Sequence, residues 1–215
     1  RRSSDLVLIK NNSEQRQKFL DFITINVTEF FRNPELFKEL ENQIKSNLLI
    51  NNSSLKIWSA ACSIGCEPYT LGIILDKLCP MANHNIIATD IDNTILSKAK
   101  IGEYTKNEMK SVNNTDLNKY FKIVDDKYYI NEKIKKMVTF KKHDLILDSY
   151  ENNFDLIVCR NVVIYFNNDI KQEIYEKFSR SLKKGGLLFV GATESIYNYR
   201  EYGFEKASTF IYKKV

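Results

Sequence analysis

The stretch IWSAACSIGCEPYT, residues 57–70, contains the change of pattern that decides the fold. Its first residues are apolar, as in a buried strand, and a run of small residues with one glycine then breaks the strand. A helix is expected to open at Glu67 and Pro68, because apolar residues recur after them at helical spacing. Those residues are Leu71, Ile74, Leu75 and Leu78. A strand, a tight loop and a helix form the first half of a βαβ unit.

Further apolar runs predict the rest of the sheet. Strands are expected within 85–92, 137–146 and 154–166, each with polar residues toward its carboxyl end, and another at 187–192. The tail, 202–215, holds two short strand candidates that suit a terminal antiparallel hairpin. Because open α/β sheets bind ligands at the carboxyl ends of their strands, these polar residues are expected to face one crevice. The pattern predicts an α/β fold with a mostly parallel sheet.

Two more helices and an insertion complete the expected architecture. Asn33 as N-cap and Pro34 at the first helical position predict a helix that begins just after Arg32. A later helix face is marked by Ile170, Ile174, Phe178 and Leu182. Glycines at 185–186 are expected to close that helix. At about 117–136 the βα rhythm lapses into alternating apolar residues, which predicts a small inserted β-ribbon subdomain.

Composition excludes several classes of protein. The chain has 215 residues, and 32 Lys and Arg against 27 Asp and Glu give a net charge of +5, too small an excess to indicate a nucleic-acid partner. No apolar run approaches the ~18 residues of a membrane-spanning helix, and the start is too polar for a secretory signal. Four cysteines, two of them in apolar runs, favour reduced thiols in a cytoplasmic protein. Cys62 and Cys66 are not expected to bind metal, since only two histidines and no second cysteine pair accompany them. The start at Arg1 rather than Met is expected of a chain whose natural N-terminus lies upstream.

The turn after the first strand indicates the ligand. A dinucleotide site uses glycines to bring backbone close to a pyrophosphate, but of Ala61, Ser63 and Gly65 only one is a glycine. An acid, Glu67, follows at the start of the helix, where it would repel phosphate. The same acid can pair with the ammonium of an amino acid head. S-adenosylmethionine (SAM) has such a head, a nucleoside and no phosphate.

An acid at the tip of the second strand supports this interpretation. Asp90 stands about where a Rossmann-type carboxylate accepts the ribose hydroxyls, with Asp92 as the nearby alternative. Each acid also has a structural explanation, because Glu67 can favour a helix dipole and Asp90 can cap the next helix. The pair in adjacent βα units favours a ligand.

With these residues in place, the chain resembles the chemotaxis receptor methyltransferase family over about residue 23 to the end. The resemblance predicts a Rossmann-like SAM-dependent methyltransferase domain at 23–215, with the family's N-terminal helical domain absent or reduced to a remnant or linker at 1–22. The matching segments are INVTEFFR (25–32), WSAACSIGCEPYT (58–70), ATDID (88–92), FKKHDLI (140–146), FDLIVCRNVVIYF (154–166) and LKKGGLLFVGATES (182–195).

The resemblance implies a cytoplasmic enzyme of bacterial signalling. Such an enzyme transfers a methyl group from SAM to glutamates on the cytoplasmic helices of transmembrane chemoreceptors, forms γ-glutamyl methyl esters in chemotaxis adaptation, and releases S-adenosylhomocysteine (SAH). A monomer without metal, nucleic acid or membrane insertion is expected.

Family positions also imply the site residues. Arg32 and Tyr165 match the residues at the reacting centre. The positions implied to bind cofactor are Asn26, Thr28, Arg32, Ala61, Glu67, Asp90, Asp144, Leu145, Arg160 and Asn161. The chain departs from the family pattern twice, because Cys66 replaces a Glu and Asp144 replaces an Asn near the adenine.

Esterification of a glutamate suits this composition. A carboxylate is already ionised at neutral pH, so the reaction needs alignment and desolvation rather than a strong base, which agrees with the near lack of histidine. Arg32 can grip a carboxylate through its planar fork, and Tyr165 can donate a hydrogen bond or pack beside the methyl. Three alternatives stay open: a nicotinamide oxidoreductase, which the missing glycines and Glu67 disfavour; a non-catalytic SAM-binding scaffold; and a nucleic-acid methyltransferase, which often carries a DPPY-like loop where this chain has RNVVIYF.

Overall fold

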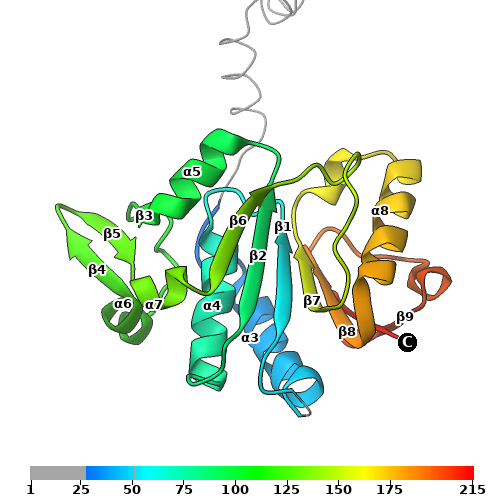
Figure 1. Ribbon diagram of the computed structural model, residues 1–215, viewed down its shortest axis with the longest axis horizontal. Helices are drawn as coiled ribbons and strands as arrows, with labels where there is room; N and C mark the ends of the chain where they lie inside the picture. The colour runs from blue at the N-terminus through cyan, green and yellow to red at the C-terminus, as the bar shows by residue number, and fades with distance from the viewer. Residues whose placement is uncertain (1–27, 51) are drawn as a thin grey trace, which may run out of the picture.

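A computed structural model describes residues 28–50 and 52–215. Its main sheet has seven strands in the order β6-β2-β1-β7-β8-β10-β9 (Figure 1). The first five are parallel, and β10 and β9 add an antiparallel edge. The strands are β1 (Lys56–Ala60), β2 (Asn85–Asp90), β6 (Val138–Lys142), β7 (Phe154–Cys159), β8 (Leu182–Val190), β9 (Phe204–Lys206) and β10 (Ile211–Lys214). The predicted α/β fold and its terminal antiparallel hairpin are confirmed.

Helices cover both faces of the sheet. On one face, the apolar residues of α3 and α4 pack against Ile57, Ile86 and Leu156. On the other face, α8 packs against Trp58 and Ile157 among others. The helices around the main sheet are α3 (Pro34–Gln43), the π-helix η1 (Ile44–Leu48), α4 (Cys66–Leu78), α5 (Asn93–Ile101), α8 (Asn168–Ser181) and the 3-10 helices η2 (Val163–Tyr165) and η3 (Tyr199–Tyr202). Within the described residues, no helix is long and apolar enough to cross a membrane.

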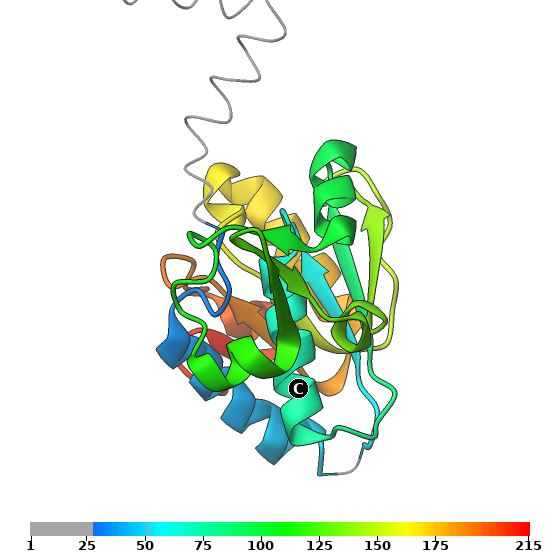
Figure 2. The ribbon, with the colours of Figure 1, turned by 90° about the vertical axis from the view of Figure 1, so that its left-hand side faces the viewer.

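The inserted subdomain is a three-stranded antiparallel sheet in the order β3-β5-β4, at the left of Figure 1 and facing the viewer in Figure 2. Its strands are β3 (Glu103–Tyr104), β4 (Phe121–Val124) and β5 (Lys127–Ile130), flanked by α6 (Asn114–Tyr120) and α7 (Glu132–Lys135). Asp125 and Asp126 form the tight turn of the hairpin, with φ of 49° and 59°. The predicted ribbon is present, and β3 joins it from outside the expected range.

An ionic cluster joins this subdomain to α4. Asp76 of α4 is buried, and its carboxylate accepts hydrogen bonds from the Tyr120 hydroxyl at 2.8 Å and the Lys119 ammonium at 3.1 Å. Lys133 of α7 pairs with the other oxygen of the same carboxylate. A second ion pair, from Lys77 to Asp116, measures 2.6 Å. The subdomain is therefore held against α4 by charges as well as by apolar contacts.

The end of α8 differs from the prediction. The helix ends at Ser181, and β8 begins at Leu182 rather than at 187, because Leu182 pairs with Phe154 across the sheet. The register then shifts, and the chain passes through Gly185 at φ 80°. A Cβ at Gly186 would lie 3.1 Å from the Phe154 carbonyl oxygen. The two glycines thus form an irregularity inside the strand instead of closing the helix.

Candidate active site

The predicted strand, turn and helix are confirmed at 56–78, and the turn is tight. Ala61, Ser63 and Gly65 have φ of 60°, 49° and 91°, in the left-handed region. The Cys62 N–H donates to the Thr89 carbonyl at 2.8 Å, which ties the turn to the end of β2. The turn therefore brings the start of α4 and the tip of β2 to one edge of the sheet.

Asp90 at the tip of β2 supports this turn. One carboxylate oxygen of Asp90 accepts the Ser63 N–H at 2.9 Å, and the other accepts the Asp92 N–H at 3.1 Å. The cap of α5 is Asp92, whose Oδ1 accepts the N–H groups of Thr94 at 2.7 Å and Ile95 at 3.3 Å. The alternative in which Asp90 caps the next helix is wrong. Asp90 keeps unused lone pairs at the crevice, whereas Asp92 Oδ1 is engaged in the cap.

Glu67 is mostly buried in the first turn of α4, with 17% of its side chain exposed. Burial raises the pKa of Glu67, and Arg160 and the hydrogen bond from Ser59 offset this only in part. The Ser59 hydroxyl donates to Oε1 at 2.8 Å, while Arg160 Nη1 lies 3.9 Å from Oε2. Arg32 also lowers the pKa of Glu67, yet the net shift stays upward. A desolvated carboxylate of this kind gains from a further cation, so the site fits an ammonium ligand.

Arg160, directly after β7, anchors the segment that carries Arg32. Its Nη2 donates to the Arg32 carbonyl and to Asn33 Oδ1, both at 2.9 Å. The guanidinium carbon lies 4.9 Å from the ring centres of Phe37 and Phe189. Burial lowers the pKa of Arg160, and Glu67 offsets part of that shift. The prediction of Asn33 as the N-cap of a helix that begins at Pro34 is confirmed. The Asn33 side chain makes no cap hydrogen bond, however, because its oxygen accepts from Arg160.

A residue to which sequence reasoning gave no role organises the loop after β7. The Glu194 side chain is buried, and its carboxylate accepts five backbone N–H groups at 2.6 to 3.3 Å. The donors are Asn161, Val162, Val163, Ile164 and Gly191. The strand predicted at 154–166 therefore ends at Cys159, and the chain continues through Asn161 at φ 61° into η2. An acid shortly after an apolar strand, in GATES, was the available signal.

Asp144 and Leu145 lie in the loop after β6. Asp144 Oδ1 accepts the N–H groups of Ile146 at 2.8 Å and Leu147 at 3.2 Å, so it holds its own loop. The Leu145 side chain packs in the core, and its carbonyl accepts the Tyr150 hydroxyl at 2.6 Å. The side chain of Leu145 is therefore turned to the core, and only its backbone is available to contact a ligand.

One cavity gathers most of the predicted site residues. The lining includes Thr28, Arg32, Ala61, Glu67, Arg160 and Asn161. Asp90 adjoins this cavity, because its carboxylate accepts the N–H of Ser63, which is a lining residue. The Ser63 hydroxyl in turn accepts from the Thr28 hydroxyl at 3.3 Å. Tyr165 lies in η2 and is 58% exposed, outside the lining. Asn26 lies outside the described residues.

The mostly parallel sheet, the acid-bearing turn after β1 and the acid at the tip of β2 are the features expected of a SAM-dependent methyltransferase. The chain belongs to the CheR methyltransferase family, whose SAM binding domain matches residues 26–211. SAM is the cofactor of this domain.

The chain is also similar to several curated proteins. A chemotaxis protein methyltransferase of Listeria monocytogenes is 41% identical over 96% of this chain and 79% of its own length. A chemotaxis protein methyltransferase of Borreliella burgdorferi is 36% identical over 90% of this chain and 72% of its own length. A chemotaxis protein methyltransferase of Salmonella typhimurium is 32% identical over 94% of this chain and 72% of its own length.

Proposed function

We propose that this protein esterifies glutamate side chains on the cytoplasmic helices of transmembrane chemoreceptors, as part of chemotaxis adaptation in the cytoplasm. The observation that carries the proposal is the position of Arg32, whose guanidinium can bind a carboxylate, in the lining of the same cavity as Glu67. No histidine lines the described part of that cavity, which agrees with an acceptor that needs no general base. The names of the relatives support the link to chemotaxis.

Glu67 would hold the ammonium of SAM and Asp90 its ribose hydroxyls, with Thr28, Ala61 and Asn161 beside them. When bound, SAM supplies an electrophilic methyl group on a sulfonium. Asp144 would lie near the adenine, where its free oxygen can accept from an amino group. Arg160 keeps Arg32 at the cavity, because it binds the backbone of Arg32.

Arg32 would bind the acceptor carboxylate and orient one oxygen for in-line attack, and Tyr165 would pack or donate beside the reacting atoms. A guanidinium that binds the carboxylate in place of water also removes hydration that weakens the nucleophile. Glu194 fixes the loop that leads to Tyr165, because five N–H groups converge on one carboxylate. The arrangement is therefore one of positioning, without covalent catalysis by the protein.

The test uses the full chain, tritium-labelled SAM and purified cytoplasmic fragments of chemoreceptors. Label that is released from the fragment by base as volatile methanol is the expected product of a glutamyl ester. Bound SAM without any transfer would favour a non-catalytic scaffold, and transfer to RNA or DNA alone would favour a nucleic-acid methyltransferase. A fragment whose acceptor glutamates are replaced by alanine is the control for transfer to other groups.

A further inference from the structure

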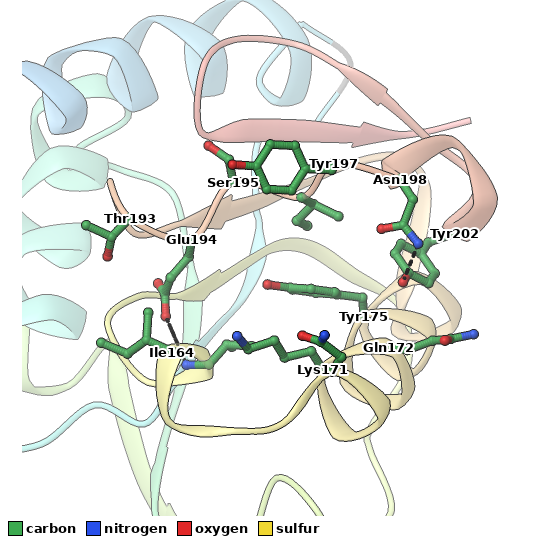
Figure 3. A pocket seen from close by; sticks show the side chains of 13 residues that line it. Ile164, Lys171, Gln172, Tyr175, Thr193, Glu194, Ser195, Tyr197, Asn198 and Tyr202 are labelled. Carbon is green, nitrogen blue, oxygen red and sulfur yellow. Dashed lines mark hydrogen bonds between the residues drawn. The ribbon is translucent and has the colours of Figure 1, made fainter.

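A second cavity lies beside η2, apart from the one that holds Glu67. We call it the α8 groove; it has a volume of about 340 Å³ and lies between η2, the first half of α8 and the loop after β8 (Figure 3). Its lining residues at the centre of the argument are Ile164, Lys171, Gln172, Tyr175, Glu194 and Tyr197. The methyl-transfer scheme above uses Glu194 of this lining to hold a loop, but it places no ligand in the groove.

The groove offers hydrogen-bond donors and a positive charge. The Tyr175 side chain is only 7% exposed, and Figure 3 shows its hydroxyl pointing into the groove. Within residues 28–50 and 52–215, neither this hydroxyl nor the Lys171 ammonium has a hydrogen-bond or ion-pair partner in the structure. Burial raises the pKa of Tyr175, so the hydroxyl stays protonated and can donate.

The one carboxylate in the lining does not cancel this character. Five backbone N–H groups occupy the oxygens of Glu194, so Glu194 does not bind Lys171 or the Tyr175 hydroxyl. The charge of Glu194 still reaches Tyr175, where it adds to burial in raising the pKa of the hydroxyl. The groove also adjoins the first turns of α8, whose N-terminus favours negative charge. The amide group of Asn168 adds a further donor, whereas the Gln172 amide donates to Glu176 at 3.4 Å. The complementary ligand is an oxygen-bearing anion, for which a carboxylate side chain is the simplest group.

The helix η2 connects the groove to Tyr165, one of the two residues proposed for the reacting centre. Ile164 lines the groove and is 40% exposed, and Tyr165 follows it in η2 with 58% exposed. Tyr197 on the opposite rim is 94% exposed. An amphipathic helix can cover such apolar rims, and its successive turns lie about 5.4 Å apart. A helix with its acceptor glutamate at Tyr165 would therefore place side chains of nearby turns over the groove.

We infer that the α8 groove binds a second carboxylate of the acceptor helix, one to two turns from the glutamate that is methylated. Lys171 and the Tyr175 hydroxyl recognise that carboxylate. The inference rests on the proposed function and deepens it, because it names the residues that select among glutamates. Sites flanked by a second acid would be preferred over isolated ones.

The test compares Lys171→Glu and Tyr175→Phe with the control Lys184→Glu, a surface lysine at the other end of β8. Steady-state methylation and the affinity of the receptor fragment for the SAH-loaded protein are both measured. Lys171→Glu should lower kcat/KM about fivefold through KM and weaken fragment binding similarly, with SAH affinity unchanged. Tyr175→Phe, which keeps the ring, should give a smaller effect in the same direction.

A fragment in which acids 3, 4 or 7 residues from the acceptor are replaced by alanine supplies the reciprocal arm. Replacement of the acid at one of these positions should lower kcat/KM by about as much as Lys171→Glu does. The two changes together should lower kcat/KM no more than either change alone. Equal KM and fragment affinity for Lys171→Glu and Lys184→Glu would overturn the inference. Absence of methylation by the unaltered protein would instead contradict the proposed function, and fragment affinity would still test the groove.

Discussion

Arg160 Nη1, directly after β7, lies 3.9 Å from Glu67 Oε2 in the first turn of α4. Through Nη2 the same guanidinium binds the backbone carbonyl of Arg32 at 2.9 Å. The acid proposed for the SAM ammonium is thus connected through one buried cation to the segment that carries the proposed carboxylate-binding residue. Cofactor and acceptor positions are expected to respond together to changes at Arg160.

Glu67→Ala should weaken SAH binding far more than Cys66→Ala. The lost charge-assisted bond is expected to cost about 1.5 to 3 kcal/mol, whereas Cys66 is fully buried and packs with Tyr69 in the core. Calorimetric titration of SAH into each variant measures the difference. Equal losses in the two variants would show that the turn binds its ligand in another way.

Glu194→Gln should destabilise the protein by about 2 to 3 kcal/mol. An amide presents one NH₂ group to backbone N–H donors that now meet two carboxylate oxygens, so several of these donors lose their acceptor. The control is Glu205→Gln, a surface acid that pairs with Lys213 at 3.5 Å, where less than about 1 kcal/mol is expected. Urea unfolding measures both. A Glu194→Gln loss no larger than the control would refute the role assigned to that carboxylate.

Asp76→Asn should destabilise the protein by about 2 kcal/mol at neutral pH, because two half-exposed lysines lose a buried partner. Burial alone would raise the pKa of Asp76, but hydrogen bonds from Lys133, Tyr120 and Lys119 hold it below its ordinary value. A carboxylate whose pKa is lowered by folding stabilises the fold at pH values above its unfolded pKa of about 3.9. This stabilisation is lost as the pH falls through the folded pKa.

The difference in unfolding free energy between Asp76→Asn and the unaltered protein should therefore stay constant near neutral pH and shrink as the pH falls below about 4. Asp126→Asn, in the exposed hairpin turn, is the control and should change stability by less than about 0.5 kcal/mol. A difference that grows toward acid pH would mean that the carboxylate is not stabilised by its lysines.

Arg32→Ala and Tyr165→Phe should each lower kcat about 10- to 100-fold while SAH affinity and melting temperature change little. Arg32→Lys keeps the charge but loses the planar fork, so a loss in that variant identifies bidentate binding. Arg180→Ala, on the exposed face of α8, controls for removal of a cation. Full activity of Arg32→Ala would remove Arg32 from the reacting centre.

Local patterns in the sequence predicted the succession of the main strands and helices along the chain, and the positions of Glu67 at the start of α4 and Asp90 at the tip of β2. The predictions failed where contacts with residues far away in the sequence determine the local structure. The strand expected at 154–166 ends early because Glu194, over thirty residues later, takes the N–H groups that a strand would use. Leu182 fits the spacing of the α8 face, yet its pairing with Phe154 places it in β8.

The role of Arg160 was also beyond a local pattern. A polar residue after an apolar strand indicates a site, but nothing near it in the sequence shows that its partners are Arg32 and Asn33. Asn33 is of a residue type that favours the N-cap, and it stands at that position in α3. Its side-chain oxygen nevertheless accepts from Arg160 and not from the backbone of the helix. In both places, a long-range contact overrides a correct local preference.

The central claim, that the acceptor is a glutamate side chain, is tested most directly by locating the transferred methyl group. A chemoreceptor cytoplasmic fragment is incubated with SAM and either the unaltered protein or Arg32→Ala, then digested and sequenced by tandem mass spectrometry. The account predicts methyl esters on glutamate side chains with the unaltered protein and far fewer with Arg32→Ala. A methyl group found on lysine, arginine or a chain terminus, and none on glutamate, would contradict it.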